Sequence, residues 1–233
     1  MSTHPTHGRI DGHIVMIGFG SIGKGTLPLI QRHFDYDPDK FSVIDPNPES
    51  AAFLAEQGIT HHQVALTPEN YRQMLGDLFP DGKGFCVNLS VDTSSLDLMK
   101  YCREIGVLYI DTVVEPWAGF YFDTTDNAER TNYALRQKVR DEKAANPGGP
   151  TAVSCCGANP GMVSWFVKEG LMTIANDLGR DDPVPVDRAG WAALMQSLGV
   201  KGVHIAERDT QARAKPRPRD VFVNTWSVEG FIA

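Results

Sequence analysis

One short segment constrains the fold of this chain more than any other. The apolar run His13–Ile17 leads directly into Gly18-Phe19-Gly20-Ser21-Ile22-Gly23, a G-x-G-x-x-G pattern between an expected strand and an expected helix. In such a turn the first glycine permits the tight bend, the second lets the backbone approach a pyrophosphate, and the third lets the helix pack closely on the sheet. The helix N-terminus then favours the anion. The segment therefore predicts a dinucleotide-binding site that includes Gly18, Gly20, Ser21, Ile22 and Gly23.

The expected choice of dinucleotide depends on Asp45. This residue ends the next apolar run, roughly 20 residues after the glycines, where a carboxylate accepts hydrogen bonds from the adenine ribose hydroxyls. Its charge would repel a 2′-phosphate, and no arginine follows it in Asp45-Pro46-Asn47-Pro48. The pattern therefore favours NAD over NADP. The alternative is a glycine turn with an exposed aspartate and no ligand.

Short β-branched runs alternate with longer helical patterns along the first two thirds of the chain, which is typical of βαβ units and a parallel sheet. Helices are expected to begin near Ile22, after Pro48, at Thr67-Pro68 and after Thr93-Ser94-Ser95. This order predicts an α/β fold with a Rossmann-type, doubly wound parallel sheet. The expected strands are His13–Ile17, Phe41–Ile44, Ile59–Val64, Gly84–Leu89, Val107–Asp111 and Thr151–Cys155.

The pattern changes after residue 160, where a second domain is expected. We predict an NAD-binding domain over residues 1–160 and, over residues 161–233, a helical connection and the incomplete beginning of an α+β substrate or dimerisation domain. The expected elements of the second part are a helix over Gly161–Leu178, a linker over Gly179–Pro185, a helix over Val186–Leu198, and strands over Val200–Ile205 and Val221–Trp226.

Composition excludes several other classes of protein. The 233 residues are 42% hydrophobic, which suits a folded globular chain, and 22 basic against 29 acidic residues give a net charge of −7. Nucleic acid is therefore an unexpected partner. The four cysteines form no C-x-x-C pair, so neither a disulfide framework nor a metal site is predicted. Without an apolar leader or an 18-residue apolar run, we expect a cytoplasmic protein that does not bind membranes.

The carboxyl ends of parallel strands border one crevice, so polar residues that follow them are candidates for ligand binding. Ser90-Val91-Asp92-Thr93 and Asp111-Thr112 occupy such positions. We expect Ser90 and Thr112 to bond ribose or phosphate, and Asp92 to face the substrate. The alternative makes Asp92 or Thr93 a helix cap.

Later segments supply further candidates for the substrate side. Gly157-Ala158-Asn159-Pro160-Gly161 is a sharp turn that would bring Asn159 towards the nicotinamide, although turn chemistry alone also explains it. Near the C-terminus, Glu207, Trp226 and Glu229 suit an ammonium ligand through ion pairing and cation–π attraction of about 0.5–2 kcal/mol. Each of them alone is also typical of core or surface.

Taken together, these segments resemble the N-terminal half of the bacterial homospermidine synthases, relatives of the saccharopine dehydrogenases. The resemblance rests on the glycine motif, Ser90-Val91-Asp92-Thr93-Ser94, Tyr109-Ile110-Asp111-Thr112, Gly157–Gly161 and Asn224-Thr225-Trp226-Ser227-Val228-Glu229-Gly230. It implies a homodimeric enzyme that uses NAD to convert two putrescines to homospermidine and ammonia. The reaction passes through imines and has no net redox change. The residues it implies around NAD are Gly18, Gly20, Ser21, Ile22, Gly23, Asp45, Ser90, Val91, Asp111, Thr112, Ala158 and Asn159, and those around the reacting diamine are Asp92, Asn159, Glu207, Trp226 and Glu229.

Two other functions stay open at this point. One is a saccharopine or carboxynorspermidine dehydrogenase-like, NAD(P)-dependent oxidoreductase, whose carboxylate-bearing substrates call for Arg or Lys in the cleft. The other is a non-catalytic NAD-sensing module, which usually ends after the sheet. The motif-bearing segments instead offer acidic and indole side chains, which favour the diamine: Asp92, Glu207, Trp226 and Glu229.

Overall fold

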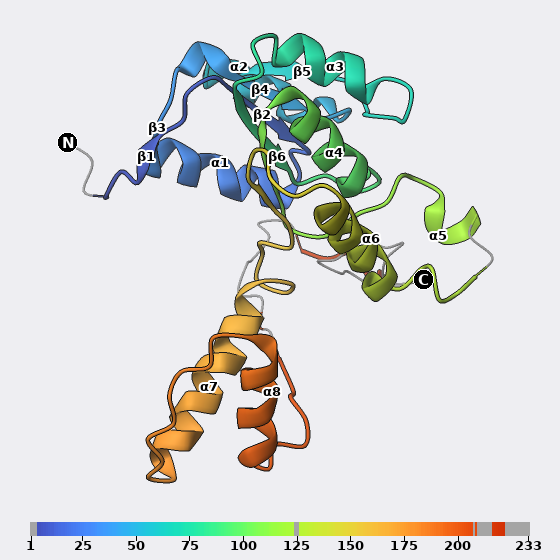
Figure 1. Cartoon of the computed structure of the whole chain (residues 1–233). Coiled ribbons are helices and arrows are strands. Elements are labelled where there is room, and N and C mark those ends of the chain that lie inside the picture. Colours follow the sequence, from blue (N-terminus) through green and yellow to red (C-terminus); the bar gives the residue numbers. More distant parts are fainter. Residues whose placement is uncertain (1–3, 124–125, 207, 209–215, 222–233) are drawn as a thin grey trace. The chain divides into compact units, whose positions relative to one another are not determined.

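A computed structural model describes residues 4–123, 126–206, 208 and 216–221 of the chain (Figure 1). The chain divides into two compact units, the first ending at Cys156 and the second beginning at Gly157. The first unit contains the strands, and the described part of the second contains two helices.

The first unit is built on six parallel strands in the order β5-β4-β2-β6-β7-β8. Taken in chain order, this is the 3-2-1-4-5-6 arrangement of a Rossmann sheet, so the predicted α/β doubly wound fold is confirmed. The six strands are β2 (His13–Ile17), β4 (Phe41–Ile44), β5 (Thr60–His62), β6 (Gly84–Asn88), β7 (Leu108–Asp111) and β8 (Ala152–Val153), and a separate parallel pair joins β1 (Gly8–Arg9) to β3 (Phe34–Asp35).

Two of the six strands have the predicted bounds and the other four are shorter. The largest differences are at β5, expected over Ile59–Val64, and at β8, expected over Thr151–Cys155 but present only at Ala152–Val153. At β8 the cause is local. The strand stops because Cys155 has φ of 61°, and its N–H donates to a side-chain oxygen of Asp111, 2.8 Å away. The main chain therefore leaves the sheet towards Asp111 instead of continuing the ladder.

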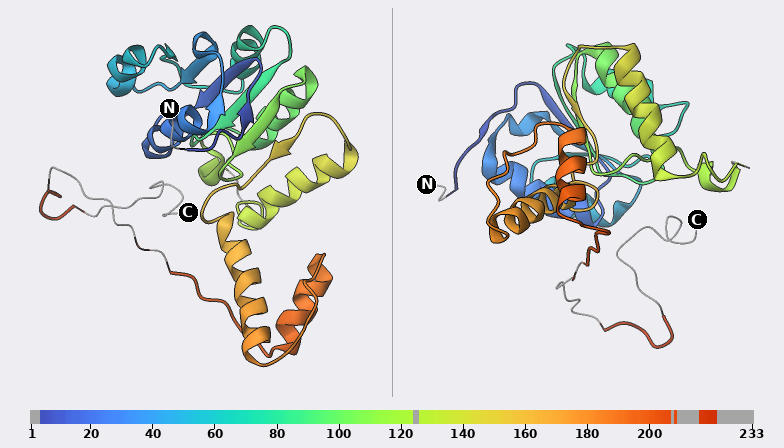
Figure 2. Two further views of the ribbon diagram at one scale, coloured as in Figure 1. Left: turned by 90° about the vertical axis from the view of Figure 1, so that its left-hand side faces the viewer. Right: turned by 60° about the horizontal axis from the view of Figure 1, so that its bottom comes forward.

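Helices cover both faces of the sheet, as Figures 1 and 2 show. In the first unit they are α1 (Ser21–His33), α2 (Ala51–Glu56), α3 (Tyr71–Leu78), α4 (Ser95–Ile105), α5 (Phe120–Asp123) and α6 (Asn132–Ala145), with short 3₁₀ turns at η1 (Pro38–Lys40) and η2 (Pro48–Ser50). Helix α4 begins as predicted, with the Ser94 hydroxyl accepting from the N–H of Asp97 at 3.2 Å. The connections between parallel strands thus cross over the faces of the sheet, as parallel strands require.

The predicted start of the third helix at Thr67-Pro68 is wrong, because α3 begins at Tyr71. The side chain of Asn70 turns back and accepts from the N–H of Thr67 at 2.8 Å while donating to the carbonyl of Ala65 at 2.9 Å. This closes a turn ahead of the helix. Asn side chains compete in this way with helical hydrogen bonding.

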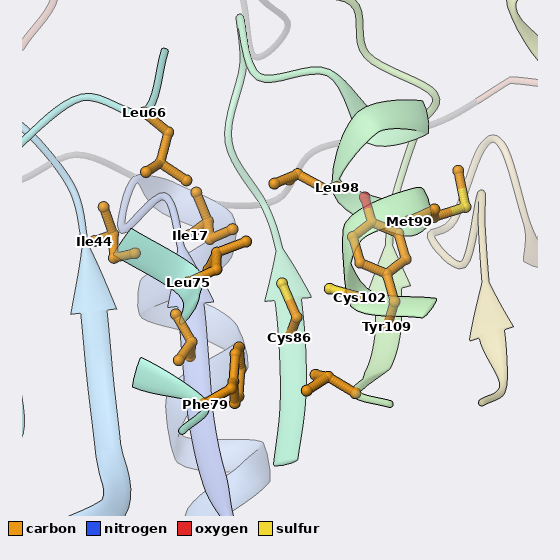
Figure 3. Close-up of a cluster of buried hydrophobic side chains, with 12 residues drawn as sticks. Ile17, Ile44, Leu66, Leu75, Phe79, Cys86, Leu98, Met99, Cys102 and Tyr109 are labelled. Carbon is orange, nitrogen blue, oxygen red and sulfur yellow. The ribbon is translucent and has the colours of Figure 1, made fainter. Parts of the chain in front are cut away.

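Alternate side chains of the central strand enter two separate cores. Val15 and Ile17 join a cluster with α3 and α4, shown in Figure 3, whereas Ile14 and Met16 join a cluster with α1 and α2. Strand side chains alternate between faces, so a strand buried on both sides must be apolar at every position. The run Ile14-Val15-Met16-Ile17 meets this requirement.

The second unit contains a helical hairpin of α7 (Met162–Asp177) and α8 (Arg188–Ser197). Both helices were predicted, and Leu171 and Leu194 are buried within the unit. The strand predicted over Val200–Ile205 is wrong, since these residues form no regular element and all of them except the half-buried Val200 are exposed. A strand needs a hydrogen-bonded neighbour, and no strand of the described residues lies beside this segment. The strand predicted over Val221–Trp226 falls, apart from Val221, outside the described residues. No helix in the described part of the chain is long and apolar enough to span a bilayer.

Two histidines lie on the α3 side of the sheet. His13 and His62 share this face with Ser42, whose hydroxyl lies 2.8 Å from Nε2 of His13. Nε2 of His62 is buried and has no hydrogen-bond partner among the described residues. Burial lowers the pKa of both rings, and the charges of neighbouring groups lower each pKa further: His62 and Lys40 for His13, and His61 for His62.

A histidine whose pKa is lowered by folding makes stability depend on pH. Below the ordinary value of 6.5 the unfolded chain takes up protons that the folded rings bind less readily, so stability is present above that pH and is lost as pH falls through it. We expect the melting temperature to fall between pH 7 and pH 5, and to fall less in His62→Leu. Melting curves across this range test the prediction, with the exposed His204→Leu as control. An identical pH dependence in wild type and His62→Leu would contradict it.

Candidate nucleotide-binding site

The glycine segment lies where the strand order reverses, between β2 and β6. The N–H of Gly18 donates to the carbonyl of Ile44 at 2.9 Å, and the N–H of Leu89 donates to the carbonyl of Ile17 at 2.7 Å. The ends of β4, β2 and β6 are thereby tied together at one edge. Ligands of open α/β sheets bind outside the carboxyl ends of the strands at this kind of switch point.

Each glycine of the motif occupies a different steric situation. Gly18 has φ of 86°, and a Cβ built there would lie 2.7 Å from the main chain of Ser90. A Cβ on Gly23 would lie 2.6 Å from the carbonyl oxygen of Gly18, so this glycine lets α1 begin close against the turn. A Cβ on Gly20 would meet no atom within 4 Å. Gly20 therefore faces open space, as a backbone that a pyrophosphate approaches should.

The carboxylate of Asp45 is held directly beside the glycine turn. Its two oxygens accept from the N–H of Phe19 at 2.5 Å and from the N–H of Asn47 at 2.7 Å. The ring of His61 donates from Nε2 to the carbonyl of Asp45 at 2.9 Å. His61 was not predicted from the sequence, because nothing in the local pattern indicates that its ring reaches the end of the neighbouring strand. Hydrogen bonds thus hold both the carboxylate and the main-chain carbonyl of Asp45.

Ser90 and Asp111 belong to one buried hydrogen-bond network behind the crevice. The Ser90 hydroxyl donates to Asn88, which donates to Tyr109, which donates to Asp111. Only 1% of Asp111 is exposed, and burial raises the pKa of its carboxyl while hydrogen bonds from Cys155, Ser154 and other neighbours oppose the shift. The carboxylate of Asp111 therefore faces the interior. A direct contact between Asp111 and a cofactor stays a prediction, as do the contacts of the exposed Val91 and the half-buried Thr112.

Asp92 lies in a turn after β6 and is not a helix cap. Its φ is 60°, its N–H donates to Oε1 of Glu115 at 3.4 Å, and its carbonyl accepts from the N–H of Ala118 at 3.2 Å. Since Ser94 caps α4, the alternative in which Asp92 or Thr93 caps this helix is wrong.

Two further residues gather around Asp92. Burial raises the pKa of the Tyr121 phenol, and the negative charges of Glu115 and Asp92 raise it further. Glu115 and Tyr121 were not predicted from the sequence, because both lie in the segment between β7 and α6 and belong to no motif. Asp92 and Glu115 thus form an acidic group, next to the Tyr121 phenol, in the segments that follow β6 and β7.

The remaining predicted site residues lie in the second unit or outside the described residues. Ala158 and Asn159 are exposed in a loop closed by hydrogen bonds from the N–H of Gly157 to Pro160 at 3.0 Å and from the N–H of Met162 to Gly157 at 2.9 Å. Glu207, Trp226 and Glu229 lie outside the described residues. Roles for all five in catalysis or cofactor binding stay predictions.

The fold and the glycine turn define a Rossmann-type dinucleotide-binding domain. The turn fits a dinucleotide, because Gly20 faces open space and no described side chain caps the start of α1. Residues 14–153 match the model of the saccharopine dehydrogenase NADP binding domain, and the chain belongs to this family.

Curated relatives and a solved structure are more specific. The chain is 61% identical to a homospermidine synthase of Mesorhizobium japonicum over 98% of its length, and 60% identical to one of Blastochloris viridis over 100%. A crystal structure of the homospermidine synthase of Legionella pneumophila in complex with NAD is similar with a TM-score of 0.82 and 35% identity, covering 96% of this chain and 46% of that one. The chain spans about half the length of the curated relatives, 48% and 50%.

The steric difference between Gly18 and Gly20 predicts that a methyl group added at Gly18 changes the free energy of unfolding much more than one added at Gly20. We expect Gly18→Ala to lower the free energy of unfolding by about 2 kcal/mol or more, because a left-handed residue is strained and its Cβ displaces the backbone of Ser90. Gly20→Ala should change it by less than about 1 kcal/mol. Urea unfolding of both variants measures the difference, and equal losses would contradict the assignment.

Proposed function

We propose that this chain is the NAD-binding part of a homospermidine synthase, which joins two putrescines with release of ammonia and no net redox change. The observation that carries the proposal is the identity of 60–61% to two curated homospermidine synthases over nearly the whole chain. The geometry of the glycine turn and the acidic group after β6 and β7 supports it. A homodimer in the cytoplasm is part of the same proposal.

NAD rather than NADP is the proposed cofactor, although the family model carries NADP in its description. A carboxylate held beside the glycine turn suits two ribose hydroxyls and opposes a phosphate in the same position. The hydrogen bonds from Phe19 and Asn47 prevent the side chain of Asp45 from turning away. The Legionella pneumophila relative was crystallised with NAD.

Bound NAD would supply hydride uptake from a carbon next to nitrogen and return hydride to the new imine. The protein must remove a proton from the substrate ammonium first, because a cationic amine holds its hydride too tightly, and must move protons in each addition and elimination. Asp92 and Glu115 place negative charge at the crevice, where it attracts an ammonium and lowers the cost of burying it. We propose that these two residues bind the diamine, with Tyr121 beside them as a hydrogen-bonding group.

The proposal also keeps the predicted roles of the residues beyond the first unit. Asn159 and Ala158 would lie near the nicotinamide, and Glu207 and Glu229 would bind ammonium groups of the substrate. Trp226 would hold a cation against its ring face, an attraction of about 0.5–2 kcal/mol. Such a set suits a diamine better than a carboxylate-bearing substrate.

The cofactor assignment predicts a measurable preference. Calorimetric titration of the chain should give at least tenfold tighter binding of NAD than of NADP. Asp45→Ala should weaken NAD by about tenfold or more, since hydrogen bonds to a charged group contribute about 1.5–3 kcal/mol, and should narrow the preference. The exposed Asp39→Ala is the matched control and should bind both cofactors as wild type does. Tighter binding of NADP by wild type would overturn the assignment.

The reaction itself predicts a distinctive balance of products. These 233 residues, joined to the second half of the Mesorhizobium japonicum relative and given putrescine with catalytic NAD, should release ammonia and form homospermidine without build-up of NADH. Absorbance at the NADH band and ammonia are followed together, with the intact relative as positive control. Asp92→Asn should lower kcat at least tenfold. Stoichiometric NADH formation would instead indicate an ordinary dehydrogenase, and no turnover with any diamine would favour an enzyme of the saccharopine dehydrogenase type.

A further inference from the structure

A buried carboxylate lies at one end of the hydrogen-bond network behind the crevice. One carboxylate oxygen of Asp111 accepts from the hydroxyl of Ser154 at 2.7 Å and from the N–H of Cys155 at 2.8 Å. The other accepts from the hydroxyl of Tyr109 at 3.0 Å. Only 1% of its surface is exposed. An ionised carboxylate only accepts hydrogen bonds, so Tyr109 must donate to it.

Because Tyr109 donates to Asp111, the direction of its hydrogen bond with Asn88 is also determined. The Tyr109 hydroxyl has a single hydrogen, so once it donates to Asp111 its oxygen can only accept, and the side-chain nitrogen of Asn88 lies 3.1 Å away as the donor. The hydroxyl of the buried Ser95 also lies against Tyr109 and Asp111, and it donates to the carbonyl of Val113 at 3.0 Å. The amide of Asn88 therefore has one orientation, with its nitrogen towards Tyr109 and its oxygen towards the crevice.

The last member of the network is Ser90. The side-chain oxygen of Asn88 accepts both the hydroxyl hydrogen of Ser90 at 2.6 Å and its N–H at 3.2 Å. The one hydrogen of the Ser90 hydroxyl is thus directed into the protein. Only the lone pairs of its oxygen remain for a ligand. Ser90 is half-buried and contacts the glycine turn at Gly18.

We propose that Asp111 determines the direction of this network, so that Ser90 acts only as a hydrogen-bond acceptor towards the nicotinamide half of NAD. The proposal rests on the proposed binding of NAD. Asp45, after β4, lies on the adenine side of the glycine turn, and Ser90, after β6, lies on the other side. The group that Ser90 accepts from is a ribose hydroxyl or the carboxamide N–H₂.

Of the two groups expected from the sequence to bond Ser90, ribose and phosphate, a Ser90 hydroxyl that can only accept excludes the phosphate. Pyrophosphate oxygens carry no hydrogen at neutral pH, so they and the Ser90 oxygen would face each other as two acceptors. Asp111, Tyr109 and Asn88 are positioning residues in this proposal, since they act on the cofactor through Ser90.

A double-mutant cycle on NAD affinity tests whether the network acts through Ser90. We expect Ser90→Ala to weaken NAD about fivefold to tenfold in calorimetry. Tyr109→Phe should weaken it severalfold, because Asn88 is then free to turn and Ser90 to redirect its hydrogen. In the Ser90→Ala background, Tyr109→Phe should have no further effect. Equal losses from Tyr109→Phe in both backgrounds would mean a purely structural role and would overturn the proposal.

A matched control separates this effect from general loosening of the core. Tyr101 packs against the same hydrophobic cluster as Tyr109 but lies outside the network, so Tyr101→Phe should leave NAD affinity unchanged. Melting temperatures of all variants confirm that binding is measured on folded protein. If wild type fails to bind NAD, the proposed function falls; if wild type binds and the cycle is additive, only this inference falls.

Two further ligands identify the group that Ser90 accepts from. Against the 3-acetylpyridine analogue of NAD, which lacks the amide N–H₂, the effect of Ser90→Ala should persist if the donor is a ribose hydroxyl and disappear if it is the carboxamide. Either result supports an acceptor role. With ADP, which carries the pyrophosphate but no nicotinamide half, Ser90→Ala should have no effect. A loss of ADP affinity as large as that of NAD would overturn the proposal.

Discussion

The close approach of Gly18 to the main chain of Ser90 is the constraint on which the rest of the first unit depends. Strands β2 and β6 are neighbours, and the turn after β2 must bend over the end of β6 within van der Waals distance. Only a residue without a Cβ and with a positive φ fits there. This contact brings the start of α1, the carboxylate of Asp45 and the hydroxyl of Ser90 to one edge of the sheet.

The same edge combines two opposite electrostatic environments. The start of α1, with its peptide N–H groups, favours an anion, whereas Asp92 and Glu115 favour a cation. An anionic pyrophosphate suits the first environment, and the ammonium groups of the proposed diamine suit the second. The buried network from Asp111 to Ser90 lies behind both regions, and it links the ends of β6, β7 and β8 by hydrogen bonds.

Family membership and molecular activity are supported at different levels. The match over residues 14–153 places the chain among saccharopine dehydrogenase NADP binding domains. The specific reaction is a property of proteins about twice as long, of which this chain spans 48–50%. Helices α7 and α8 follow the Rossmann unit in a separate compact unit, so the residues proposed for the diamine come from more than one part of the chain.

The sequence by itself determined the Rossmann-type parallel sheet and the glycine turn of a dinucleotide-binding domain. These follow from short-range patterns: apolar runs buried on both faces, and a glycine turn whose three positions each have a local steric reason. The bounds of β2 and β4 and the approximate start of α4 were predictable for the same reason, whereas the cap of α4 at Ser94 was not among the caps expected. The start of α3 was not, because the side chain of Asn70 closes a competing turn.

Only the tertiary structure decided which polar groups meet across strands. Asp111 looked like a crevice residue because it ends a strand, yet its carboxylate is buried by contacts with Tyr109, Ser154 and the N–H of Cys155. Glu115 joins Asp92 through a loop that carries no motif. Hydrogen bonds between residues 20 to 45 positions apart leave no periodic trace in a sequence, since their partners are chosen by the packing of neighbouring strands and by the cost of leaving a buried polar group unpaired.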